Sequence, residues 1–238
     1  MTRAAEIRER RRFQRRRQRR TWILIIIGVA LIATALLILP SLTPLGEIAI
    51  PQNSPRPMGQ GTTMGDASAP VLIEEWADFQ CPACRRYAEN VEPELVRNYV
   101  ATGKVRVVFH HFPFIGEESR QAALASMCAA DQGRFWEYYD ILFANQTGEN
   151  VGAFTDRRLE GFAEAIGLSM DDFTSCFRGN RHMSQIDQER IAGVKLGISG
   201  TPAILINGRE VTPGVVPSFE QLQQAIEAEL AGSQPPTP

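Results

Sequence analysis

Two cysteines stand where an extended apolar segment becomes a helical one, and this junction constrains the fold more than any other feature of the chain. The stretch VLIEEWADFQCPACRRYAENVEPEL, residues 71–95, places Cys81 and Cys84 with two residues between them. Its first half is apolar and partly alternating, which predicts a strand. Its second half begins at Pro82 and repeats apolar residues every four positions, which predicts a helix. The chain is therefore expected to fold as an α/β domain with a cysteine at a strand–helix junction.

Three kinds of site could use a cysteine pair with this spacing. A zinc site usually needs four protein ligands, and the three histidines, His110, His111 and His182, lack the spacing of a zinc finger. A purely structural disulfide across two residues is the second alternative. The third is a dithiol–disulfide centre that opens and closes.

Local physics favours the redox centre. Cys81 would be the N-cap of the helix, and Pro82 would occupy the first helical position, where proline is preorganised. The free N–H groups at this helix end stabilise a thiolate and lower the pKa of Cys81. Cys84 lies one turn further on the same side, where it can attack a mixed disulfide at Cys81.

A second motif far downstream completes a resemblance. GISGTPAILING, residues 197–208, predicts a strand that follows Gly200-Thr201-Pro202. With DFQCPAC after a strand and a helical insertion between the two motifs, the chain resembles the thioredoxin superfamily. Within it, the chain is similar to the membrane-anchored DsbA-type thiol–disulfide oxidoreductases, over about residues 64–231. The resemblance implies a thioredoxin-like fold with a helical insertion at about 117–198.

The resemblance also implies a role for the downstream motif. Pro202 would be the cis-proline of the family, packed against the active-site disulfide; proline is the residue for which a cis bond costs least. The backbone of Thr201 would then bind an extended substrate chain by strand addition. The alternative is an ordinary turn before an edge strand.

Glu75 lies six residues before Cys81, where the superfamily places a buried carboxylate beneath the cysteines. Burial would raise its pKa, so that it could take the proton of Cys84. Strand alternation points the neighbouring Glu74 the other way, toward solvent. The alternative is that both carboxylates are solvated on an edge strand.

Cys128 and Cys176 remain once the first pair is assigned, and each lies on an apolar helical stretch of the insertion. Thiols outside the cytoplasm tend to oxidise, so we expect a structural disulfide between them. Closing a loop of about 48 residues would stabilise the domain by roughly 4 kcal/mol on the chain-entropy model. Two buried free thiols are the alternative.

The N-terminal region predicts an anchor. Residues 1–20 carry ten Arg and two Glu, a net charge of +8, so the rest of the chain carries −10 within the total of −2. Residues 22–39 are uncharged and would span about 27 Å as a helix, which predicts a transmembrane segment. The arginines would keep residues 1–21 in the cytoplasm and the rest outside it. The acidic body makes nucleic acid an unfavourable partner.

The remaining boundaries follow from composition. Residues 40–61 are proline-rich and predict an extended linker. Residues 62–231 would form the thioredoxin-like domain, and residues 232–238 a frayed tail.

The expected function is the formation of disulfides in exported proteins. Cys81 would act as the nucleophile and Cys84 as the resolving cysteine, without metal or cofactor. The resemblance implies a membrane quinone-linked partner that reoxidises the enzyme. Ala83 stands where the best-known family pattern has His, so the direction of electron flow stays open. The alternatives are a disulfide reductase or isomerase, and a non-catalytic thioredoxin-fold module that binds a peptide or a metal.

Overall fold

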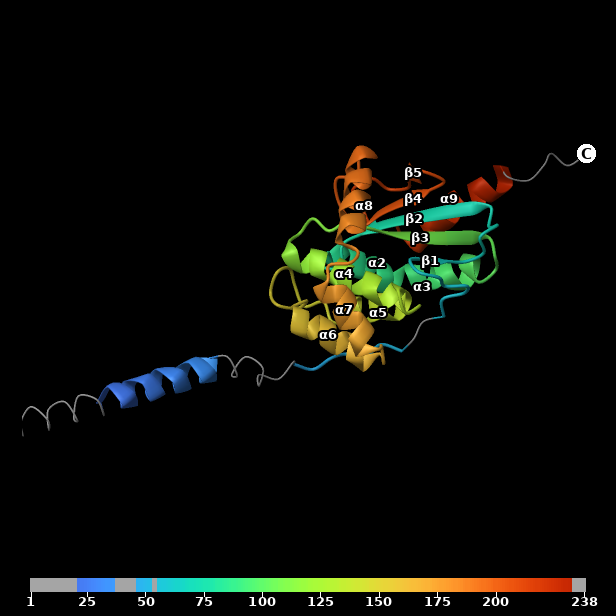
Figure 1. The fold of residues 1–238 in the computed structure, drawn as a ribbon. Coiled ribbons are helices and arrows are strands. Elements are labelled where there is room, and N and C mark those ends of the chain that lie inside the picture. The colour runs from blue at the N-terminus through green and yellow to red at the C-terminus, as the bar shows by residue number, and fades with distance from the viewer. Residues whose placement is uncertain (1–20, 37–45, 53–54, 233–238) are drawn as a thin grey trace, which may run out of the picture. The chain divides into compact units, whose positions relative to one another are not determined.

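The domain is built on a five-stranded sheet with the strand order β1-β3-β2-β4-β5 (Figure 1). The computed structural model describes residues 21–36, 46–52 and 55–232. The chain divides into two units, residues 1–46 and 47–238, and the sheet lies in the second. Its strands are β1 Thr63–Met64, β2 Val71–Ala77, β3 Val105–His111, β4 Ala203–Ile206 and β5 Arg209–Glu210.

The two long strands, β2 and β3, form the parallel centre of the sheet. β4 pairs antiparallel with the other side of β2, and β5 forms an antiparallel hairpin with β4. Successive side chains of a strand point to opposite faces. On β2 this alternation sends Ile73 into the main core and Trp76 into a smaller cluster with Phe112 and Leu205.

The crossover from β2 to β3 is helical in three short pieces. α2 (Pro82–Asn90) begins at the cysteine motif, α3 (Glu92–Leu95) follows, and a π-helical turn (Val96–Val100) ends the crossover. The sequence predicts one helix kinked by Pro93, and the break falls at Val91, two residues before it. The explanation is that proline has no N–H to donate and crowds the preceding turn.

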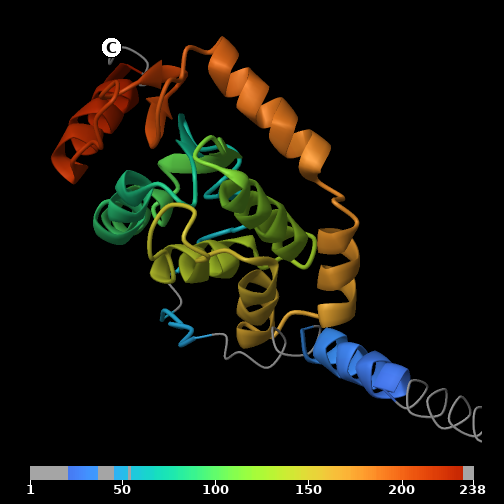
Figure 2. The same cartoon turned by 90° about the vertical axis from the view of Figure 1, so that its left-hand side faces the viewer.

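The helical insertion lies between β3 and β4, as expected. It consists of α4 Glu117–Ala130, α5 Phe135–Ala144, α6 Asp156–Ala165, α7 Met170–Arg178 and α8 Met183–Lys195. Figure 2 shows α8 (orange) as a separate helix that leads from the helical block back to the sheet. α8 packs closely against the domain at Gly193, where a Cβ would come within 2.7 Å of the Phe112 ring.

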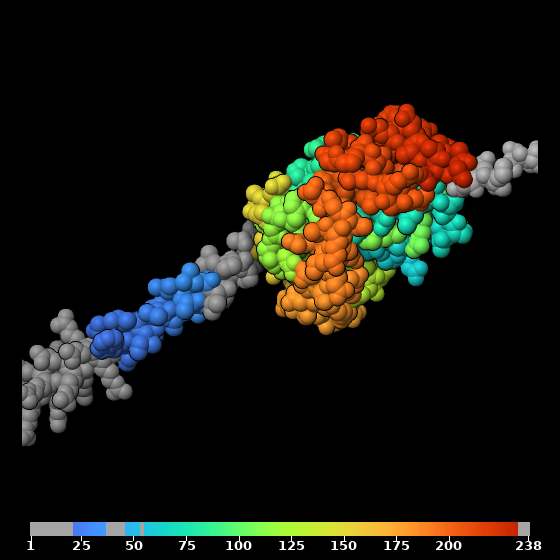
Figure 3. All heavy atoms as spheres, turned by 90° about the horizontal axis from the view of Figure 1, so that it is seen from above, coloured from blue at the N-terminus to red at the C-terminus, as the bar shows by residue number. Residues whose placement is uncertain are grey.

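The last helix, α9 (Phe219–Gly232), returns to the main core. It buries Leu222 and Ile226 and contacts α3 and β2. In Figure 3, α8 (orange) and the C-terminal segment (red) form one continuous side of the domain.

Cys128 of α4 and Cys176 of α7 are joined by a disulfide, with their Cα atoms 5.7 Å apart. Both residues are 1% exposed. The bond ties together two helices whose cysteines are 48 positions apart in sequence.

The structure does not support the predicted transmembrane helix over residues 22–39. It describes a helix over residues 21–36, and residues 37–39 lie outside the described residues. Within the described part of the chain, no helix is both long enough and apolar enough to cross a membrane.

The predicted linker, residues 40–61, differs from an extended tether where the structure describes it. Residues 47–52 and 55–61 belong to the same unit as the domain. Arg56 pairs with Glu92 and Asp140 at 2.8 and 2.5 Å, and its guanidinium lies over the ring of Trp136 at 5.0 Å. Ala49 also exchanges two hydrogen bonds with the side chain of Asn145, at 2.9 and 2.7 Å. Composition alone could not reveal these contacts, because they depend on tertiary packing.

Candidate active site

Cys81 lies at the N-cap of α2, as the sequence predicts. Its backbone is extended, with φ −72° and ψ 119°, and Pro82 occupies the first turn. The backbone N–H of Cys81 donates to the carbonyl oxygen of Asp78 at 3.0 Å. The sulfur therefore sits where the helix presents free N–H groups and its positive end.

The two thiols of the motif differ in environment. Cys81 is 7% exposed and Cys84 is fully buried. The pKa of Cys81 is lowered to about 6, chiefly because the thiol of Cys84 hydrogen-bonds to it. Thr201 and the N–H groups at the start of α2 act in the same direction, and burial opposes them. At neutral pH Cys81 is therefore mainly a thiolate.

Cys84 has the opposite character. Burial raises its pKa well above the ordinary value, and the neighbouring Cys81, which accepts its hydrogen bond, raises it further. A buried thiol that donates a hydrogen bond to a thiolate keeps its proton. One sulfur of the pair can attack, and the other stays protonated.

The downstream motif meets the cysteines in space. The Thr201–Pro202 peptide bond is cis. The Sγ of Cys81 lies 3.2 Å from the carbonyl oxygen of Thr201, to which it donates a hydrogen bond when it is in the thiol form. The turn is thus in direct contact with the reactive sulfur, although 120 positions separate the two residues.

Three polar residues that sequence reasoning missed hold the loop before Cys81. Asp78 accepts hydrogen bonds from the N–H of Gln80 at 2.8 Å and of Phe114 at 2.9 Å. The Gln146 amide donates to the carbonyl oxygens of Phe79 and Cys81 at 2.6 and 3.1 Å. Asp78 and Gln80 could have been found as polar residues that end an apolar strand. Gln146 carries no such signal, because it lies in the insertion.

Glu75 is fully buried on β2 and points into the main core. Its Oε1 accepts a hydrogen bond from the hydroxyl of Tyr139 at 3.2 Å. Its Oε2 has no hydrogen-bond partner among the described residues. Glu74, its neighbour, lies on the other face within 3.3 Å of His110, with 22% of its side chain exposed.

A second buried carboxylate, Glu92, shares the surroundings of Glu75. Burial raises the pKa of Glu75 well above its ordinary value, and the negative charge of Glu92 raises it further. Arg56 offsets this only in part, because its guanidinium also pairs with Asp140. A buried cluster with more carboxylates than cations retains a proton, and we assign that proton to Glu75.

The pKa of Cys84 is raised mainly by burial and by the neighbouring Cys81, and Glu75 is not among these main causes. Burial raises the pKa of Tyr87, one turn after Cys84 on α2, and the carboxyl group of Glu75 raises it further. The structure thus places Glu75 in a polar cluster under the helix, rather than in direct partnership with the second sulfur.

One cluster with metal-ligand spacing occurs in the described part of the chain, formed by Asp131, Cys176 and His182. Cys176 is bonded to Cys128, so it offers no thiolate there. The cluster is therefore not an intact ligand set.

An activated thiol at a helix N-terminus, a buried partner thiol and a cis-proline turn on this sheet define a thiol–disulfide oxidoreductase with a thioredoxin-like fold. A family model described as thioredoxin matches residues 58–228. The chain is 30% identical over 172 residues to the probable disulfide bond formation protein D of Bacillus anthracis, covering 71% of this chain and 77% of that protein.

Solved structures agree on the fold. BdbD from Bacillus subtilis, in its oxidised form, matches with a TM-score of 0.67 and 24% identity, over 74% of this chain and 96% of that one. The alpha-DsbA1 of Wolbachia pipientis matches with a TM-score of 0.65 and 23% identity, over 74% and 94%. The chain belongs to the thioredoxin family and is a thiol–disulfide oxidoreductase related to the disulfide bond formation proteins.

The lowered pKa of Cys81 can be tested by titration. The ultraviolet absorbance of the thiolate in the reduced protein should rise with a midpoint at about pH 6. Cys84→Ala removes the hydrogen bond that contributes most to the lowered pKa of Cys81, so this pKa should rise toward the ordinary 9.0. Cys84→Ser keeps a donor and should hold the pKa lower than Cys84→Ala does. Equal midpoints in all three proteins would refute this origin of the shift.

The protonated state of Glu75 predicts a pH-dependent effect of Glu75→Gln. The folded-state pKa of Glu75 lies above the ordinary 4.5, so above that pH the folded state keeps a proton that the unfolded state has lost. The stability that this group contributes is complete below pH 4.5 and falls as the pH rises toward the folded-state pKa.

Glu75→Gln removes this loss. Its free energy of unfolding in guanidinium, relative to wild type, should therefore increase as the pH rises above 4.5, by at most about 1.4 kcal/mol per pH unit. Glu74→Gln is the matched control, with the same change in charge at an adjacent, partly exposed position. A difference that stays constant with pH would show that Glu75 ionises normally.

Proposed function

We propose that this protein oxidises pairs of thiols in exported proteins, with Cys81 as the nucleophile and Cys84 as the resolving cysteine. The observation that carries the proposal is the asymmetry of the two thiols. Cys81 is partly accessible, has a pKa of about 6 and contacts the cis-proline turn, whereas Cys84 is buried and holds its proton.

The oxidising reaction proceeds by two exchanges. A substrate thiolate attacks the sulfur of Cys81 in the oxidised enzyme, the bond between Cys81 and Cys84 breaks, and Cys84 leaves and takes up a proton. A second substrate thiolate attacks the substrate sulfur of the mixed disulfide and releases Cys81 as a thiolate. The substrate loses two electrons and gains a disulfide, and the enzyme ends as a dithiol.

Glu75 is proposed to exchange the proton of Cys84 in this cycle by an indirect route, because the two side chains share no hydrogen bond among the described residues. A buried carboxylic acid with a raised pKa can give a proton to a leaving thiolate and take it back on reoxidation. Support comes from its burial beneath α2 and from its raised pKa. Thr201 and Pro202 are proposed to bind the substrate backbone beside the reactive sulfur.

The surroundings of the reaction are also part of the proposal. The bond between Cys128 and Cys176 supports an oxidising, extracytoplasmic compartment, because structural disulfides persist there. An oxidising enzyme must be reoxidised after each turnover, and a quinone-linked partner in the membrane would supply the acceptor. Thiol–disulfide exchange itself needs no bound cofactor.

The reduction potential tests the direction of the reaction. A thiolate that is stabilised in the reduced enzyme favours reduction of the enzyme and oxidation of the substrate. We expect equilibration with glutathione buffers to give a potential nearer to about −120 mV than to about −270 mV. A value near the lower figure would support a reductase instead. Ala83→His should be measured beside the wild type, because a cationic side chain next to the cysteines should raise the reduction potential further.

A trapping experiment tests the assignment of the two cysteines. Cys84→Ser cannot close the internal disulfide, so substrate proteins should accumulate as mixed disulfides on Cys81 and appear on non-reducing gels. Cys81→Ser is the matched control and should trap few or none, because the remaining thiol is buried and protonated. Equal trapping by both variants would contradict the assigned roles.

A further inference from the structure

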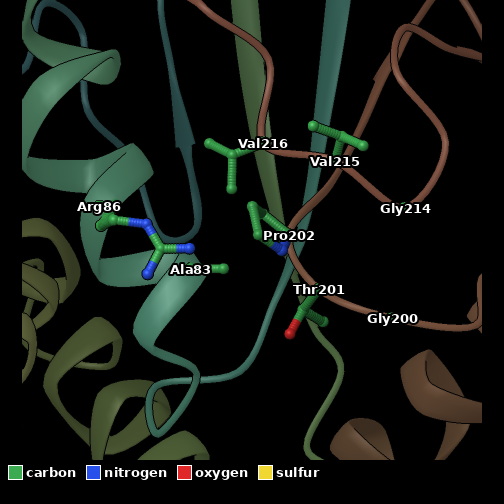
Figure 4. A pocket seen from close by; sticks show the side chains of 8 residues that line it. All are labelled: Ala83, Arg86, Gly200, Thr201, Pro202, Gly214, Val215 and Val216. Carbon is green, nitrogen blue, oxygen red and sulfur yellow. The ribbon is translucent and has the colours of Figure 1, made fainter.

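A pocket lies directly beside the cis-proline turn, with a volume of about 320 Å³. Figure 4 shows the side chains around it, with α2 on one side and the two loops that flank β4 and β5 on the other. The lining residues are Ala83, Arg86, Gly200, Thr201, Pro202, Gly214, Val215 and Val216. Because the carbonyl of Thr201 contacts the sulfur of Cys81, whatever occupies this pocket lies next to the reacting atom.

Arg86 gives the pocket a positive charge. It lies three positions after Ala83 on α2, so the two residues share one face of the helix. Figure 4 shows its guanidinium turned toward Ala83 and Pro202. The guanidinium has no hydrogen-bond or ion-pair partner among the residues that the structure describes, although its side chain lines a built pocket.

The adjacent Arg85 shows what a paired arginine on this helix looks like. Its Nε donates to the carboxylate of Glu89 at 2.7 Å, and its Nη1 donates to the carbonyl oxygen of Gln146 at 2.9 Å. The donors of Arg85 are thus engaged by the protein itself, whereas those of Arg86 remain available to a ligand. Guanidinium donors fit a carboxylate in particular, because both groups are planar and can form two parallel hydrogen bonds.

The opposite wall of the pocket is apolar. Val215 is 64% exposed, and it lies with Val216 and the ring of Pro202 around the opening. An extended polypeptide could place an aliphatic side chain against the two valines while a neighbouring side chain reaches Arg86. The combination of one free cation and an apolar wall fits a peptide segment better than a small ion.

We propose that Arg86 is a specificity-determining residue that favours polypeptide substrates with an Asp or Glu side chain within a few residues of the reacting cysteine. The inference rests on the proposed function, because it assumes that substrate thiols react at Cys81. The proposed role of Arg86 specifies which side chains lie beside the cysteine in a preferred substrate. The domain as a whole is acidic and would repel an acidic peptide. The expected preference therefore comes from the local contact with Arg86 and acts against the net charge.

The test compares two peptides of identical composition, each with one cysteine. In one peptide two Glu flank the cysteine and two Lys lie at the far end, and in the other the positions are exchanged. The rate of mixed-disulfide formation with the oxidised protein is measured by acid quench and mass spectrometry. Each rate is divided by the rate of the same peptide with an uncharged small disulfide, which removes the effect of neighbouring charge on the thiol itself.

The wild-type protein should favour the peptide with Glu beside the cysteine by about two- to fivefold, the range of an exposed ion pair. Arg86→Gln should remove the preference, and Arg86→Glu should reverse it. Arg85→Gln is the matched control and should leave the preference at the wild-type value. The rate of each protein with an uncharged small thiol is measured in parallel, so that a change in the reactivity of Cys81 itself is separated from a change in the ratio of the two peptides.

The outcomes distinguish the role of Arg86 from the oxidoreductase function. If both peptides react at equal normalised rates with the wild type, or if Arg85→Gln changes the ratio as much as Arg86→Gln does, the role of Arg86 is overturned and the oxidoreductase function stands. If no thiol forms a mixed disulfide with the oxidised protein, the proposed function fails, and the role of Arg86 fails with it.

Discussion

The site depends on one contact, that between the sulfur of Cys81 and the carbonyl oxygen of Thr201. This contact exists because β4 runs antiparallel to β2 and pairs Trp76 with Ala203. The register brings the turn before β4 to the end of β2 at which α2 begins. A shift of the register by one residue would turn every side chain of β4 to the opposite face and would remove the turn from the sulfur. The sheet thus fixes the distance between two motifs that lie 120 positions apart.

The insertion is part of the site rather than an addition to the fold. Its helix α5 supplies Tyr139 to Glu75 and Asp140 to Arg56. The segment after α5 supplies Gln146 to the loop before Cys81. The disulfide between α4 and α7 holds the helices that surround α5. A change in the packing of the insertion would therefore reach the cysteine loop through buried hydrogen bonds.

Sequence reasoning found the parts of this site that carry strong local signals. Cys81 before Pro82 identifies a helix N-terminus, and Thr201-Pro202 before an apolar run identifies the turn that opens a strand. Glu75 could be placed inside because the resemblance implies a buried carboxylate six residues before Cys81, and strand alternation then turns Glu74 to the opposite face. Glu92 and Arg56 could not be found in this way. Glu92 lies on a short helix that follows a break, and Arg56 lies in a proline-rich segment that was expected to stay away from the domain. A buried ion pair between such segments depends on tertiary packing, and neither periodicity nor composition records it.

The asymmetry of the two sulfurs also bears on which way a mixed disulfide decays. Two thiols compete for it: Cys84, which would close the internal disulfide and return the substrate unchanged, and a second thiol of the substrate. A thiol reacts as its thiolate, and a sulfur leaves faster when its pKa is low.

Cys84 is buried with a raised pKa, so only a small fraction of it is present as the attacking thiolate. Cys81 has a pKa of about 6 and is a good leaving group. In the proposed oxidising direction, the substrate's own second thiol attacks the substrate sulfur and Cys81 leaves as a thiolate. The hydrogen bond that Cys84 then donates to Cys81 stabilises this thiolate, so in the proposed cycle the contact favours completion of the substrate disulfide.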